Sequence, residues 1–413
     1  MKHLIKVIFY IIIVTLFTIE LKAQYIVVNQ REGSIFLAEY ENNRVKMQKN
    51  NEPSSENENC SNIFSNKEQL TIAYTTFNGK NELINREGSL DNETLAKRAI
   101  NKQSTSIEAR DFIIEQAKEY GYKDRGGSFM IADSKEVHIL EIIGKGEAND
   151  GIIWISVPLP SNHIYVNTGT ATITKFIENN NNNGMEHCRD IISFAVESGY
   201  FLGKNVDFNF AENYTSPDST KKKYHNELYK EIKSVILKEL GLIESPNNYS
   251  AVNTPVRSIG IGRKEVKIDQ IRVVLENLSP KENNQYGAFI VEKRDHLPKV
   301  LKTVQWHGIG FNDIILFSPI YLNISDYKIY LNRESPSLNY INQSGFKEAA
   351  DNKEEKYKTL IPVIDKSAKL LIKDDNHFEA KLLLSEFTKG QLLIVADLIE
   401  RLKEEEKSYN KDN

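Results

Sequence analysis

The stretch from Gly127 to Phe176 constrains the fold of this 413-residue chain more than any other part. It contains a series of short runs rich in β-branched, aliphatic and aromatic residues, which predict β-strands near residues 128–132, 137–143, 152–157 and 164–167. The links Asp133-Ser134-Lys135-Glu136 and Ala148-Asn149-Asp150-Gly151 are short and polar. Links of this kind suit antiparallel hairpins.

Helical patterns lie on both sides of these strands. Thr105-x-x-Glu108 has the spacing of a capping box, and apolar residues follow at helical spacing up to Gly121. Further helices are predicted over 93–100, 188–198, 224–240 and 266–276, and further strands over 25–28, 34–38, 70–77, 287–292 and 314–321. Thr388-x-x-Gln391 predicts the cap of a final helix over 388–405. Runs of strands between runs of helices indicate an α+β fold.

The N-terminus has the pattern of a secretory signal peptide. Lys2 and Lys6 precede an apolar run from Val7 to Ile19, and the small residue Ala23 follows. The run is shorter than the roughly 20 residues of a comfortable membrane span. We therefore predict a signal peptide over 1–23 and one domain over 24–413, on which the helix 388–405 packs. The mature protein is expected to be exported, periplasmic or secreted, with no stable membrane span; a retained signal anchor is the alternative.

Charge and motif content narrow the classes of partner. The 53 basic and 57 acidic residues nearly cancel and form no long block of one sign, so we predict no nucleic-acid partner. The sequence contains no His-x-His, His-Glu-x-x-His or Cys-x-x-Cys spacing, so we predict no metal site and no cofactor. The pattern does not predict an oligomeric state.

Several sequence blocks occur in the order and at the spacing of one enzyme family. They are Tyr120-Gly121-Tyr122 with residues 127–133, residues 190–195 with Gly199-Tyr200-Phe201, Leu297-Pro298 with Trp306-His307-Gly308 and residues 318–321, and residues 384–387. Together they resemble the N-terminal-nucleophile (Ntn) cysteine dipeptidases, the relatives of dipeptidase A and secernin.

The resemblance implies a fold and a chemistry. The fold is a four-layer αββα sandwich, with two antiparallel sheets covered by helices, and the substrates are short peptides. In such enzymes an N-terminal cysteine attacks the peptide carbonyl while its own α-amino group, with a pKa of roughly 7.7 to 8.0, acts as the general base. Side-chain amides and backbone N–H groups stabilise the developing oxyanion.

This chain departs from the family where the chemistry takes place. Gln24 occupies the position of the family's nucleophilic cysteine, and a glutamine amide is not a nucleophile. The family's oxyanion asparagine is kept as Asn167, but the arginine that follows it is replaced, with Thr172 nearest. Tyr74 stands where the family has glutamate. We therefore expect peptidase activity to be impaired or lost, and a non-catalytic peptide-binding or structural protein on the same fold is the alternative.

The remaining candidates for chemistry are few. Cys60 could become an N-terminal nucleophile if cleavage occurred before it, although the strand over 70–77 then follows too soon for the family's opening hairpin. Cys188 follows His187, but neighbours on a helix point about 100° apart, so we predict a structural cysteine. Whether the two cysteines form a disulfide stays open. Asn167 is either an oxyanion donor or a strand-end residue that ties down a turn.

Overall fold

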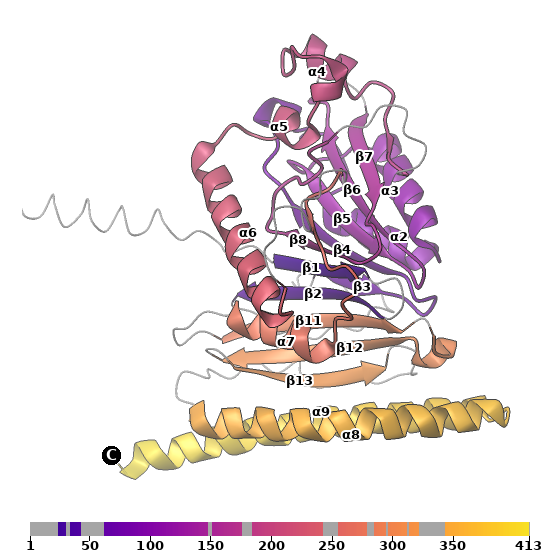
Figure 1. The fold of residues 1–413 in the computed structure, drawn as a ribbon, viewed down its shortest axis with the longest axis vertical. Helices are drawn as coiled ribbons and strands as arrows, with labels where there is room; N and C mark the ends of the chain where they lie inside the picture. Colours follow the sequence, from indigo (N-terminus) through magenta and orange to yellow (C-terminus); the bar gives the residue numbers. More distant parts are fainter. Residues whose placement is uncertain are drawn as a thin grey trace, which may run out of the picture.

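The computed structural model describes residues 24–29, 34–42, 62–147, 151–175, 184–242, 255–278, 285–294, 296–311, 314–321 and 343–412. The predicted signal peptide, Cys60 and the link residues 148–150 lie outside these ranges. Within them the chain forms two antiparallel sheets and two groups of helices (Figure 1). The predicted α+β class is confirmed.

The larger sheet has seven strands and contains the start of the described chain. Its order is β10 (Ser258–Gly260), β8 (His163–Asn167), β1 (Gln24–Asn29), β2 (Ser34–Asn42), β11 (Gln285–Arg294), β12 (Thr303–Phe311) and β13 (Ile314–Tyr321). Strand β1 therefore lies between its hairpin partner β2 and the distant β8, with which it pairs antiparallel.

The smaller sheet has six strands and contains most of the hairpins predicted from sequence. Its order is β3 (Ile63–Ser65), β4 (Thr71–Thr76), β5 (Gly127–Ala132), β6 (Val137–Gly144), β7 (Ile152–Pro158) and β9 (Glu186–His187). The β5–β6 turn is closed by Asp133, whose Oδ1 accepts the N–H groups of Lys135 at 2.7 Å and Glu136 at 3.1 Å. An Asp side chain commonly closes turns in this way.

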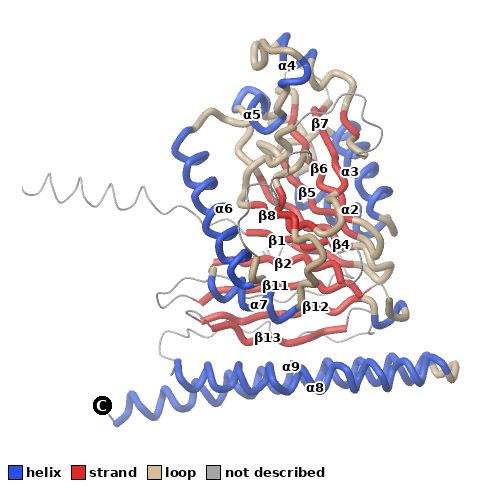
Figure 2. The backbone as a smooth tube through the Cα atoms, viewed as in Figure 1, coloured by secondary structure: helices blue, strands red, loops and turns tan. Residues whose placement is uncertain are grey.

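Helices cover both outer faces of the paired sheets (Figure 2). The α-helices are α2 (Asn92–Lys102), α3 (Ser106–Tyr120), α4 (Ser193–Glu197), α5 (Phe210–Tyr214), α6 (Ser219–Glu239), α7 (Ile268–Asn277), α8 (Gln343–Lys373) and α9 (His377–Asp412). Short 3-10 turns are η1 (Asn81–Leu83), η2 (Asn205–Asp207) and η3 (Lys299–Leu301). The predicted capping box is confirmed, because the Thr105 hydroxyl accepts the Glu108 N–H at 3.2 Å and the Glu108 carboxylate accepts the Thr105 N–H at 3.2 Å.

Buried apolar side chains define the order of the layers. One cluster lies between the sheets and joins Val27 of the larger sheet to Met130 of the smaller. A second joins the other face of the larger sheet to α6, α7, α8 and α9, and a third joins the other face of the smaller sheet to α2 and α3. Burying apolar surface of this kind is the main favourable contribution to folding.

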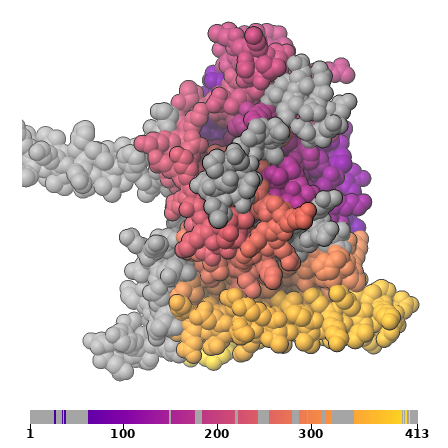
Figure 3. Space-filling view, in the orientation of Figure 1, coloured from indigo at the N-terminus to yellow at the C-terminus, as the bar shows by residue number. Residues whose placement is uncertain are grey.

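The C-terminal helices differ from the prediction. Helix α9 begins at His377, so Thr388 lies inside it rather than at its cap, and the Thr388 hydroxyl donates to the Leu384 carbonyl at 2.8 Å. The pair α8–α9 lies along β13, the outermost strand of the larger sheet, and appears as a yellow band at one end of the molecule (Figures 1 and 3). Covering an edge strand in this way blocks its pairing with another chain.

Two buried cations connect the layers. Arg294 on β11 forms an ion pair with Asp365 on α8, with 2.6 Å between Nη1 and Oδ2, and the Tyr321 hydroxyl donates to Asp365 Oδ1 at 2.7 Å. Lys293 points into the other side of β11, where its ammonium donates to the carbonyl of Gln69 in the β3–β4 turn. Burial lowers the pKa of Lys293 to about 7.

Helix α4 is shorter than the predicted helix over 188–198. The Cys188 N–H donates to the Trp154 carbonyl at 3.1 Å, so this residue continues the edge of the smaller sheet after β9. The helix forms only from Ser193 and is followed by Gly199, which has a φ of 73°. Among the helices of the described ranges, none combines the length and apolar composition needed to cross a bilayer.

Candidate functional site

A group of polar side chains lies between the two sheets, where apolar packing would otherwise be continuous. We call it the inner polar cluster; its members are Ser128, Glu141, Tyr165, Asn167 and Thr172, all 0–1% exposed. Alternation along the strands explains their position, because the neighbours Met130, Ile139 and Ile143 belong to the apolar cluster between the sheets.

Strand pairing brings the cluster together from both sheets. Ser128 on β5 lies directly opposite Glu141 on β6 in the smaller sheet. Tyr165 and Asn167 come from β8 of the larger sheet, and Thr172 follows β8 along the chain. The cluster therefore spans the space between the sheets.

The amide of Asn167 is engaged on both sides. Its Nδ2 donates to Ser128 Oγ at 3.0 Å and to Tyr165 Oη at 2.8 Å. Its Oδ1 accepts the N–H of Gly169 at 2.7 Å, and Gly169 has a φ of 85°. This is the geometry of a residue that ties down a turn. To donate to an oxyanion, Asn167 would have to give up one of its Nδ2 bonds.

Glu141 is the buried carboxyl group of the cluster. Its Oε1 accepts the backbone N–H of Thr172 at 2.5 Å and the Thr172 hydroxyl at 2.7 Å, and its Oε2 accepts the Ile173 N–H at 3.3 Å. Burial raises the pKa of Glu141 to about 7, although the bonds from Thr172 and Ile173 oppose that rise. The carboxyl group can therefore hold or release a proton near neutral pH.

Arg257 supplies positive charge beside the cluster. It precedes β10, its guanidinium carbon lies 4.1 Å from the ring centre of Tyr229, and Nη2 donates to Thr170 Oγ1 at 3.3 Å. Burial lowers the pKa of Arg257, while the charge of Glu141 acts to raise it. Thr172, predicted from sequence to lie nearest the position of the family's arginine, donates its hydroxyl to Glu141.

Sequence reasoning missed Ser128, Glu141 and Arg257. Ser128 and Glu141 carry a signal, because each is a polar residue at an inward position of a strand whose other inward residues are apolar. Arg257 carries none, since it lies in an irregular segment far from β8 along the chain.

The start of β1 lies next to this cluster. Gln24 is the first residue of β1 and pairs with Tyr40 of β2, while the next residue, Tyr25, pairs with Asn167 of β8. The backbone therefore brings the position predicted for the family's nucleophile beside the predicted oxyanion asparagine, Asn167. Cys60 lies outside the described residues, so its role as an alternative nucleophile stays a prediction, as do the roles of Gln24 and Asn167 in catalysis.

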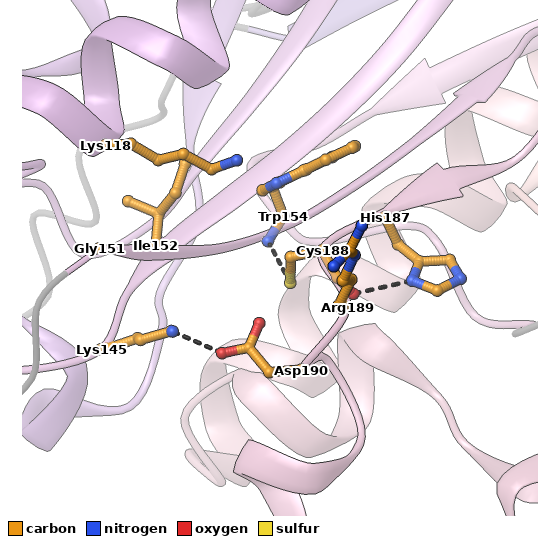
Figure 4. A pocket seen from close by; sticks show the side chains of 9 residues that line it. All are labelled: Lys118, Lys145, Gly151, Ile152, Trp154, His187, Cys188, Arg189 and Asp190. Atoms are coloured by element: carbon orange, nitrogen blue, oxygen red, sulfur yellow. Dashed lines mark hydrogen bonds and ion pairs between the residues drawn. The ribbon is translucent and has the colours of Figure 1, made fainter.

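Cys188 has the environment of a structural cysteine (Figure 4). It is a free thiol whose sulfur accepts the Trp154 N–H at 3.5 Å, and burial raises its pKa to about 12. The thiolate is the nucleophilic form, so this thiol is inert at neutral pH. The Nδ1–H of His187 donates to the Cys188 carbonyl at 2.8 Å rather than activating the sulfur.

Side chains that could bind a metal ion do not cluster in the part of the chain that the structure describes. Over the described ranges, no group of three or more His, Cys, Asp or Glu side chains could hold a metal ion.

Comparison with known proteins places these features in a family. The sequence model of peptidase family C69 matches residues 37–234. This match supports a relation of the chain to peptidase family C69. The C69 match begins within β2 and ends within α6, so it contains the inner polar cluster but not Gln24 or Arg257. It confirms the resemblance to the dipeptidases predicted from the sequence. No curated protein matches the chain.

Proposed function

We propose that this chain is an exported member of the C69 dipeptidases that binds short peptides where β1 and β8 meet, and that its peptide-bond hydrolysis is impaired or lost. Family C69 suggests a peptidase that acts on peptides. The further steps rest on the local residues of this chain.

One observation carries the proposal: β1 begins with Gln24 beside the strand that ends in Asn167. In the N-terminal-nucleophile mechanism, a thiolate and a free α-amine must stand together at the start of the first strand. Glutamine has no thiol. If Gln24 became the mature N-terminus, its side chain could also cyclise onto the α-amine, which would remove the general base.

The inner polar cluster supports a retained peptide site. Short peptides carry donors, acceptors and terminal charges, and the cluster offers a carboxyl group with a pKa of about 7 in Glu141 and a nearby guanidinium in Arg257. A few placed polar groups in an otherwise apolar interior are typical of small-molecule sites. Peptide entry would require Asn167 to exchange one of its internal hydrogen bonds for a bond to the ligand.

Active catalysis through a displaced thiol is the competing function. Cys188 is buried with a raised pKa, which leaves Cys60 as the candidate. Intact-mass analysis of the mature protein tests the proposal directly. A mature N-terminus at Gln24 supports export with loss of the nucleophile, whereas a mature N-terminus at Cys60 supports a working N-terminal cysteine and contradicts the proposal.

A further inference from the structure

A pocket of about 460 Å³ lies at the edge of the six-stranded sheet, on the far side of β7 from the inner polar cluster. Lys118 from the end of α3, Lys145 from the segment after β6, and Arg189 and Asp190 from the turn after β9 line it (Figure 4). The wall includes Trp154 of β7.

The pocket exists because β9 is short. Strand β9 pairs with β7 only at Ile155 and Ser156, and beyond it Cys188 bonds Trp154 through its N–H and its sulfur. Toward Ile152, at the start of β7, the described chain has no further strand on this edge. An edge strand that is unpaired over part of its length can leave backbone groups and side chains open to a ligand.

The charge of the pocket is positive. Asp190 is its carboxylate, and Lys145 Nζ lies 2.5 Å from Asp190 Oδ2, so these two charges offset each other. Lys118 and Arg189 remain, both exposed. The Cys188 thiol adds no negative charge, because burial keeps it protonated.

An apolar surface adjoins these cations. The ammonium of Lys118 lies 5.5 Å from the ring centre of Trp154, and Ile152 lies beside them in the wall. A cation held next to an aromatic ring can bind an anionic group while the ring contacts the apolar part of the same molecule.

We propose that this pocket binds a small organic carboxylate with an apolar or aromatic body. Lys118 and Arg189 hold the carboxylate, and the partly exposed ring of Trp154 contacts the body of the ligand. The site is separate from the proposed peptide site between the sheets, so either can fail without the other.

The probe for this test is benzoate, compared with its neutral amide benzamide and with inorganic phosphate. The chain has two tryptophans, and Trp306 is 3% exposed in a different layer, so Trp154 fluorescence should report binding. Trp154→Phe identifies the reporter. The charge variants are Lys118→Gln, Arg189→Gln and the double variant, and Arg263→Gln is the matched control, since it removes an exposed arginine on the turn after β10.

We expect benzoate to change the fluorescence and to bind about tenfold more tightly than benzamide, because two exposed charge contacts each contribute a factor of about 2 to 5. Each single variant should weaken the binding of benzoate by that factor, and the double variant should bind benzoate no more tightly than benzamide. Arg263→Gln should leave the affinity for benzoate unchanged. Equal affinity for benzoate and benzamide, an equal effect of Arg263→Gln, tighter binding of phosphate, or no response would each overturn the proposal.

Discussion

Thr172 donates both its backbone N–H and its hydroxyl to one oxygen of Glu141, at 2.5 and 2.7 Å. These bonds favour the charged carboxylate, but complete burial outweighs them and raises the pKa of Glu141 to about 7. The pair lies between the sheets and joins the segment after β8 to β6. The ionisation of Glu141 should therefore affect the stability of the whole fold.

Glu141→Gln should remove a pH-dependent part of the stability. The raised pKa means that the folded state holds the proton of Glu141 more tightly than the unfolded state does. The contribution of this protonated group to the free energy of unfolding is therefore fully present below about pH 4.5 and is lost as the pH rises through about 7. From pH 5 to pH 8 this loss is about 2 to 3 kcal/mol. Urea unfolding at pH 5 and pH 8 measures the free energy of unfolding of both proteins. The variant should gain that amount of stability relative to wild type on going from pH 5 to pH 8. Glu87→Gln, an exposed control, should show no such growth, and an equal growth in both variants would refute the assignment.

Lys293→Met should show the opposite pH dependence. Burial lowers the pKa of Lys293 to about 7, so the unfolded state holds its proton more tightly and the lysine destabilises the fold increasingly as the pH falls from about 10 to 7. The variant leaves the Gln69 carbonyl without this donor, a constant cost that does not depend on pH. The stability of the variant relative to wild type should therefore be about 2 to 3 kcal/mol greater at pH 6 than at pH 9. The exposed control Lys347→Met should give the same relative stability at both pH values.

Asp365→Ala should loosen the attachment of α8 to the larger sheet. It leaves the guanidinium of Arg294, with 8% of its side chain exposed, without its carboxylate and removes the acceptor of the Tyr321 hydroxyl. Breaking a buried ion pair typically costs about 3 kcal/mol or more. The urea midpoint should fall accordingly. Asp374→Ala removes an exposed carboxylate just beyond the same helix and should leave the midpoint unchanged, so similar losses in both variants would show that the pair has no special role.

Cys188 should be unreactive in the native protein. In Cys60→Ala it is the one remaining thiol, and its pKa is raised to about 12 by burial. A disulfide reagent such as DTNB at pH 8 should detect no thiol in the folded variant and one thiol per chain after denaturation in urea. Rapid labelling of the folded variant would instead make Cys188 an accessible nucleophile.

The local elements of the first half could be predicted because their signals lie within the elements. Strands β5 to β8 have β-type runs bounded by turn residues, and α3 has its capping box. Strand β12 was missed because glycine weakens a strand pattern, and Gly308 is required by packing: a Cβ there would lie 2.6 Å from Ile315 Cγ2 and 2.8 Å from Phe317 Cε1. Helix α8 was missed as well, since it continues through Pro362, a residue that usually ends a helix.

Residues of the candidate site could be predicted only where the chain can be compared with the family's motifs. Asn167 and Gln24 were identified from the family pattern, and pairing of β1 with β8 places them side by side along the backbone. That Ser128 lies opposite Glu141, and that Arg257 lies near Glu141, depends on strand register and on long-range packing. A sequence pattern fixes which face a residue occupies but not what lies across from it.

Hydrolysis of a dipeptide library tests the central claim most directly. The mature protein is assayed beside its Cys60→Ala variant, with product formation followed by release of free amino acids. The account predicts no turnover above background in either sample, because the proposal assigns Gln24 to the position of the family's nucleophile. Turnover that disappears in Cys60→Ala would make Cys60 the nucleophile, and turnover that survives in Cys60→Ala would reveal a different catalytic group; either result would contradict the loss of peptidase activity.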